Sequence, residues 1–159
     1  MEKEFLQLKS FLGSKGIDYE VKEHEPVFTA EEAAKARGID LKSDVKSMVF
    51  AATGTSSEPE FVIALVPSDM KVDTKKLSQY LKKQVRLATP KEVKQAAGCE
   101  VGSVHPFGSL FGLRVIADDD ILDNDKVSFS AGLHTKSITM KARDMFALIN
   151  PEIVDIAKT

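Results

Sequence analysis

Lys46 is the first of three features in the 159-residue chain whose residue types and spacing could do chemistry. It lies in the segment 44–49 (DVKSMV), which has the composition of a β-strand. Side chains alternate between the two faces of a strand, so Lys46 and Met48 share one face with Asp44. Lys46 is therefore either a solvated side chain on the open face of a sheet or a cation directed at a phosphate or carbonyl group.

The second feature is the segment 98–108 (GCEVGSVHPFG), which holds three glycines and one proline in eleven residues. Glycine lets backbone N–H groups come close to a ligand, and such groups suit an ester carbonyl or a developing oxyanion. A tight connection across a sheet edge would use the same residues. His105, within this loop, is either a proton carrier or a surface residue.

The third feature is His134, in the segment 131–137 between two predicted strands. It is either an ordinary exposed turn histidine or a neutral imidazole that contributes a hydrogen bond at pH 7. The chain has no phosphate-binding Gly-Lys-Ser loop, no dinucleotide fingerprint and no G-x-S-x-G elbow. The histidines and Cys99 lack the spacing of metal ligands, and an isolated cysteine is usually inert, so we expect neither a metal nor a cofactor.

The elements that must position these residues follow from periodicity and capping patterns. Thr29 and Thr89 each begin a capping box that predicts a helix. Helices are predicted over 2–15, 29–38, 73–81, 89–98 and around 145–149; strands are predicted over 18–25, 45–52, 61–66, 85–87, 113–117, 126–130 and 137–141. Without repeats or a linker, residues 1–159 are expected to form a single α+β domain with a mixed, mostly antiparallel sheet.

Composition excludes several classes of protein. The chain has 22 basic and 24 acidic residues, a net charge of −2, which excludes coating of nucleic acid by bulk charge. Its 43% hydrophobic content excludes a disordered chain. Apolar runs such as 61–66 are far below the ~20 residues that a membrane helix needs, and the N-terminus lacks a signal-peptide core. We therefore expect a cytoplasmic protein without a membrane partner.

One segment departs from this neutral average. Residues 71–94 contain eight basic and two acidic residues, a local net charge of +6. The segment is either a solvated helix face or a patch that binds a nucleic-acid backbone. Its basic residues are Lys71, Lys75, Lys76, Lys82, Lys83, Arg86, Lys91 and Lys94.

Taken together and in order, these features resemble the YbaK/prolyl-tRNA-synthetase-associated domain family. The resemblance rests on Lys46 in V-K-S-M, the G-C-x-x-G-x-x-x-P-F-G pattern at 98–108 and A-G-x-H at 131–134, and extends to His24-Glu25-Pro26. It implies an α+β domain around a mixed, partly closed sheet. It also implies an aminoacyl-tRNA deacylase that removes a small mischarged amino acid (Ala, Cys, Ser or Thr), most often from tRNA(Pro), and here acts in trans.

The resemblance also implies roles for individual residues. Lys46 matches the family's functional lysine, Gly102 and Pro106 match the ends of the loop that faces the aminoacyl group, and His134 matches a later histidine. Water would attack the ester without a nucleophilic side chain or a metal. Nearness to these motifs in sequence adds further candidates for the substrate pocket: Phe28, Val45, Met48, Ser103 and Phe107.

The expected partner is the aminoacylated end of tRNA, held by Lys71, Lys75, Lys76, Lys82, Lys83 and Arg86. An aminoacyl-tRNA synthetase or an elongation factor could supply tRNA identity. The alternative is a module of the same fold that binds an aminoacyl or nucleotide end, or a synthetase, without hydrolysis. A generic small-molecule hydrolase is disfavoured because the chain lacks a recognisable nucleophile.

Overall fold

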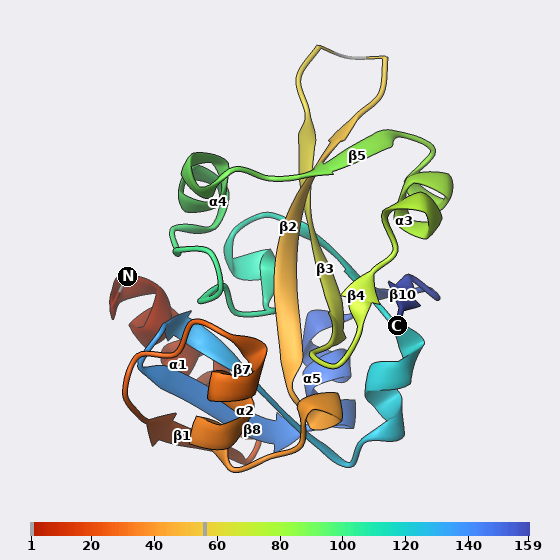
Figure 1. Cartoon of the computed structure of the whole chain (residues 1–159). Helices are drawn as coiled ribbons and strands as arrows, with labels where there is room; N and C mark the ends of the chain where they lie inside the picture. The colour runs from red at the N-terminus through yellow and green to blue at the C-terminus, as the bar shows by residue number, and fades with distance from the viewer. Residues whose placement is uncertain (1, 56) are drawn as a thin grey trace.

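The hairpin of β2 (Val45–Thr53) and β3 (Glu60–Pro67) lies at the centre of the protein in the computed structural model (Figure 1). The two strands pair antiparallel, with Lys46 opposite Val66. Both faces of the hairpin are covered, which explains why its strands are nearly continuous apolar runs. The structure describes residues 2–55 and 57–159.

The other described strands range from two residues to the eight of β7, and the helices span two to four turns. The helices are α1 (Glu2–Ser14), α2 (Ala30–Arg37), α3 (Thr74–Leu81), α4 (Pro90–Ala97) and α5 (Ala142–Ile149). The remaining strands are β1 (Tyr19–Glu23), β4 (Lys71–Val72), β5 (Gln84–Leu87), β6 (Arg114–Ala117), β7 (Lys126–Leu133), β8 (Lys136–Lys141), β9 (Glu152–Ile153) and β10 (Ala157–Lys158).

The strands of the described residues are arranged in three sheets. The five-stranded sheet has the order β5-β2-β3-β6-β9 and is mixed, since β6 runs parallel to both β3 and β9. The order β1-β8-β7 forms an antiparallel three-stranded sheet, and β10 pairs with β4. The α+β class with mixed, mostly antiparallel pairing is confirmed. Among the described residues, no helix is long and apolar enough to cross a bilayer.

The side-chain alternation of the central hairpin fills two separate hydrophobic clusters. One cluster contains Val49 and Leu65 and extends to the buried faces of α1, α4 and α5. The other contains Phe50 and Val66 and extends to Leu77 on α3. A one-residue slip of register would exchange these two sets, so the pairing of β2 with β3 is strongly specified.

Side-chain caps fix where α2, α3 and α4 begin, as the sequence predicts. The Thr29 and Thr89 hydroxyls accept the backbone N–H of Glu32 and Glu92, and the two glutamates complete both capping boxes. The Asp73 side chain caps α3 in a simpler way, accepting two backbone N–H groups. The capping box at Thr29 matters for function because it sets the path of the chain into the pocket described next.

Candidate functional site

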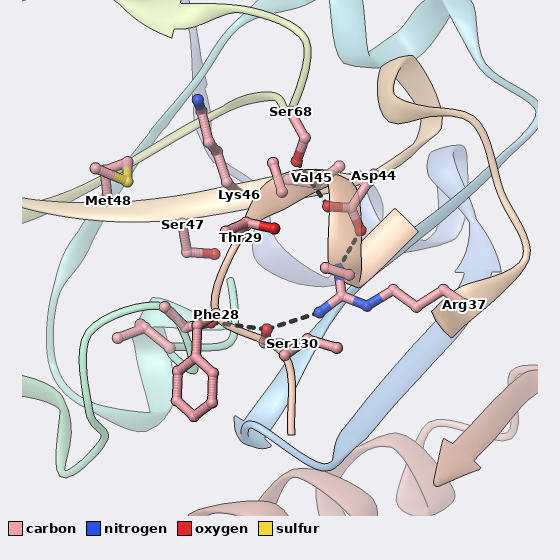
Figure 2. A pocket seen from close by; sticks show the side chains of 15 residues that line it. Phe28, Thr29, Arg37, Asp44, Val45, Lys46, Ser47, Met48, Ser68 and Ser130 are labelled. Carbon is pink, nitrogen blue, oxygen red and sulfur yellow. Dashed lines mark hydrogen bonds and ion pairs between the residues drawn. The ribbon is translucent and has the colours of Figure 1, made fainter. Parts of the chain in front are cut away.

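A pocket of about 160 Å³ lies beside the first half of β2 (Figure 2). On one side β2 pairs with β3 along its length, but on the other side β5 pairs only with 50–53. Within the described parts of the chain, residues 45–48 thus have a strand partner on one side only. The segment before α2, the loop around Gly102 and Ser130 of β7 form the facing walls of the pocket.

Lys46 lines this pocket and is half-buried. Its side chain and that of Met48 project from one side of β2, whereas Ser47 projects from the other (Figure 2). Burial, together with the positive charge of nearby Lys71, lowers the pKa of the Lys46 amine. Across residues 2–55 and 57–159 the amine has no hydrogen-bond or ion-pair partner, so it is available to an anionic ligand.

Gly102 also lines the pocket, with a backbone φ of +87° that favours glycine. Its carbonyl accepts a hydrogen bond of 2.9 Å from the Ser130 hydroxyl. The neighbouring Ser103 is buried and does not line the pocket. Its N–H and its hydroxyl both donate to the Glu100 carbonyl, at 3.0 and 2.8 Å. Ser103 therefore braces the loop and offers no free amide to a ligand.

The rest of the loop runs into the core. Phe107 is fully buried and packs edge-on against Phe11 at 5.8 Å, and Pro106 is buried beside it. The pocket lining therefore includes neither of these two residues that the sequence placed near the substrate. His105 is also fully buried, and its Nδ1 accepts the Phe107 N–H at 3.1 Å. Burial lowers the pKa of His105 to about 3, so this side chain is neutral and remote from the surface.

His134 lies next to the pocket but does not line it. Its Nδ1 donates to the Val27 carbonyl at 3.1 Å, and its backbone carbonyl accepts the Val27 N–H at 3.3 Å. The imidazole packs against the Phe28 ring at 4.8 Å, while Nε2 faces Glu100 at 3.4 Å. His134 thereby holds Phe28, whose side chain remains 75% exposed at the pocket.

A buried ion pair in the pocket wall was missed by the sequence analysis. Arg37, the last residue of α2, is 5% exposed and bonds to Asp44, which is 2% exposed. The other carboxylate oxygen of Asp44 accepts the Ser68 hydroxyl at 2.6 Å. Burial raises the pKa of Asp44, while Arg37 and Ser68 oppose that shift. In sequence, Arg37 looks like an ordinary basic residue of a last helical turn.

Ser47 is a second residue that the sequence did not single out. Its hydroxyl is buried, lines the pocket and, among the described residues, has no hydrogen-bond partner. A buried hydroxyl without a partner costs free energy, so a ligand that completes its hydrogen bonding gains affinity. Val45 and Met48, both predicted for the pocket, do line it beside Ser47.

The predicted tRNA-binding residues fall into two groups. Lys76, Lys83 and Arg86 pair with Asp155 (3.0 Å), Glu60 (3.2 Å) and Glu92 (2.7 Å), which offsets their charges. Lys71, Lys75 and Lys82 are exposed on β4, on α3 and just after α3. The residues of the second group are open to a nucleic-acid backbone.

Among the described residues, the one group of side chains close enough together to hold a metal ion is Asp118 to Asp120. Asp118 already accepts the N–H groups of Ile156 and Ala157, both at 2.9 Å. None of the three lines the pocket, so this group has no part in the site beside β2.

The fold and pocket agree with what comparison with known proteins finds. The family model for the aminoacyl-tRNA editing domain matches residues 24–148, which include every pocket-lining residue. The chain belongs to this family and is an aminoacyl-tRNA editing protein.

Particular relatives define its place more closely. The Escherichia coli protein named multifunctional Ser/Thr-tRNA deacylase ProXp-y is 29% identical over 155 residues, covering 96% of this chain and 92% of that protein. The proline–tRNA ligase of Thermosipho melanesiensis is 31% identical over 100 residues, which are 62% of this chain and 17% of the ligase. A solved structure described as a candidate trans-editing enzyme for prolyl-tRNA synthetase is 25% identical, with a TM-score of 0.85 and 98% coverage of both chains.

Proposed function

We propose that the chain is an editing domain that hydrolyses, in trans, the ester between a small amino acid and the terminal adenosine of tRNA. The observation that carries the proposal is the pocket itself: it is small, it lies beside an unpaired half-buried lysine, and part of its wall is polar. At about 160 Å³ it is below the 300–1,000 Å³ range of typical ligand sites, which favours a side chain of a few atoms.

Serine and threonine fit the pocket better than alanine. The unpartnered Ser47 hydroxyl gives a side-chain hydroxyl something to bond to, and an alanine would leave it unsatisfied. The E. coli relative is named for Ser/Thr-tRNA deacylation, which supports the same choice. The similarity to proline–tRNA ligases and to a trans-editing enzyme for prolyl-tRNA synthetase supports tRNA(Pro) as a carrier.

In the proposed mechanism Lys46 binds the terminal phosphate and thereby orients the ester. Backbone N–H groups around Gly102, other than that of Ser103, polarise the ester carbonyl, because the Ser103 amide is already bonded within the loop. A water oxygen attacks the carbonyl carbon, the ester C–O bond breaks, and the ribose oxygen leaves with a proton. The free ribose hydroxyl of the substrate assists the water, as the family resemblance implies.

A charged tRNA substrate also implies contacts outside the pocket, a partner protein and a cellular compartment. Lys71, Lys75 and Lys82 are the exposed cations that would contact the tRNA backbone. A synthetase or an elongation factor would supply tRNA identity beyond the acceptor end. Because its substrate is charged tRNA, the enzyme is expected in the compartment where translation takes place.

The test is a deacylation panel of tRNA(Pro) charged with Pro, Ala, Cys, Ser or Thr, together with the cognate tRNAs of the last four. We expect hydrolysis of the Ser and Thr esters and protection of prolyl-tRNA(Pro). Hydrolysis of Ala esters in preference to Ser and Thr would contradict the role of Ser47. Binding without hydrolysis of any ester would identify a non-catalytic module instead.

A further inference from the structure

The Arg37–Asp44 pair lies where an ion pair is expensive, in the pocket wall and almost fully buried. Taking two charges out of water costs several kcal/mol per ion, which mutual attraction seldom more than repays. Such a pair contributes little to folding stability. Its hydrogen bonds indicate a different role, which is to connect parts of the pocket wall.

The guanidinium of Arg37 donates in three directions. Nη1 reaches Asp44, Nη2 reaches the Ser130 hydroxyl on β7 at 2.8 Å, and Nε reaches the Ser137 hydroxyl on β8 at 2.7 Å. Because the Ser130 oxygen accepts from Arg37, its own proton is directed elsewhere, and it donates to the Gly102 carbonyl at 2.9 Å. Figure 2 shows this chain of bonds running from Asp44 through Arg37 to Ser130.

The Gly102 loop has no regular secondary structure at this point, so hydrogen bonds hold it in place. The Ser130 bond adds to the 2.9 Å bond that the Gly132 N–H of β7 donates to the Ser103 carbonyl. Its backbone conformation at Gly102, with φ of +87°, is one that a β-ladder would not impose. At the other end of the chain of bonds, Asp44 lies two residues before Lys46 and leads directly into β2. The buried pair therefore links the strand that carries Lys46 to the loop that carries Gly102.

We infer that Arg37 and Asp44 are positioning residues that, through Ser130, hold the Gly102 peptide at a fixed place in the pocket that Lys46 also lines, for ester hydrolysis. The inference rests on the proposed function for its catalytic consequence, while the positioning itself is a property of the free protein. A displacement of about 1 Å in a reacting group can cost on the order of 100-fold in rate.

The chain offers a matched pair of variants. Ser130→Ala and Ser137→Ala each remove one buried hydroxyl that accepts from Arg37, but Ser130 alone of the two bonds to Gly102. We expect Ser130→Ala to lower kcat about 10- to 100-fold with little change in KM. Ser137→Ala, which lies outside the pocket lining, should change kcat by less than about threefold. Equal losses in the two variants would overturn the inference.

A double replacement tests the ion pair itself. Arg37→Met/Asp44→Leu exchanges the pair for apolar side chains, a change that cores often accept without loss of stability. We expect it to lower kcat as Ser130→Ala does, and addition of Ser130→Ala should then cost nothing further, because both changes break one chain of bonds. Multiplicative losses would show that Ser130 acts independently of Arg37. If the double replacement does not fold, Arg37→Lys provides the same comparison with the charge retained.

Amide hydrogen exchange in the free protein separates this inference from the proposed function. Exchange at residues 100–104 should rise about two- to tenfold in Ser130→Ala, the factor that loss of one hydrogen bond produces, and should be unchanged in Ser137→Ala. If the wild type hydrolyses no charged tRNA but the loop responds in this way, the proposed function fails and the positioning stands. An unchanged loop in Ser130→Ala refutes the positioning whatever the activity.

Discussion

Replacing Lys46 with Met tests the central group of the proposed site. The change removes the charge but keeps most of the apolar stem. If the amine binds the terminal phosphate, one charge-assisted hydrogen bond worth about 1.5–3 kcal/mol is lost. We therefore expect kcat/KM for seryl-tRNA to fall about 10- to 150-fold. Lys126→Met, an exposed lysine at the start of β7, is the matched control and should leave kcat/KM unchanged.

Stability distinguishes loss of function from loss of fold in this variant. The Lys46 amine is partly desolvated and lies near Lys71, so its charge is disfavoured in the folded state. Its removal should leave the melting temperature unchanged or slightly higher. Deacylation by Lys46→Met within about threefold of wild type, in a sample that melts like wild type, would refute the role of the amine.

The lowered pKa of Lys46 predicts a pH dependence with a definite sign. Phosphate binding needs the charged amine, so activity should decline as pH rises through a value below the ordinary 10.5. The unfolded chain holds this proton over the window between the two pKa values, so titration of Lys46 makes folding stability rise with pH there. After subtraction of spontaneous ester hydrolysis, Lys46→Met should lack the alkaline decline in kcat/KM. A wild-type profile that is flat up to pH 10.5 would contradict the assignment.

Three further perturbations probe the surroundings of the pocket. Gly102→Ala forces a side chain into φ +87° and places its Cβ 3.4 Å from the His134 ring. We expect the free energy of unfolding, measured by chemical denaturation, to fall by about 1–2 kcal/mol and kcat to fall as well. An unchanged kcat would contradict a role of the Gly102 loop in catalysis. Lys75→Glu with Lys82→Glu should raise KM for tRNA and flatten its salt dependence, whereas a normal salt slope would exclude these lysines from the interface. The ring resonances of His105 should stay at their neutral positions from pH 8 to pH 5 in NMR titration, because burial lowers its pKa to about 3; a midpoint near 6 would contradict the buried placement.

Local patterns in the sequence predict the elements well because their causes are local. The capping boxes at Thr29 and Thr89 and the apolar runs of the central hairpin are complete within short segments. The placement of Lys46 and Met48 on one side of β2 follows from the strand period alone. These features need no knowledge of what packs against them.

The pocket wall could not be predicted in the same way because its contacts are distant in sequence. Arg37 and Ser130 are 93 residues apart, and only the folded chain brings them within hydrogen-bond distance. Nearness in sequence was equally misleading for Phe107, which follows the Gly102 loop but turns into the core against Phe11. Loop composition indicates a special backbone, but not which of its side chains face a ligand.

Two features that ordinarily cost stability meet at this one pocket. An open strand edge invites unwanted pairing, and β2 leaves one exposed where β5 does not follow it past Phe50. A buried ion pair costs desolvation, and the Arg37–Asp44 pair lies at the same end of the strand. Folded proteins tolerate such violations mainly at functional sites. Under the proposed function, a substrate bound in this pocket would lie beside the free edge of residues 45–48.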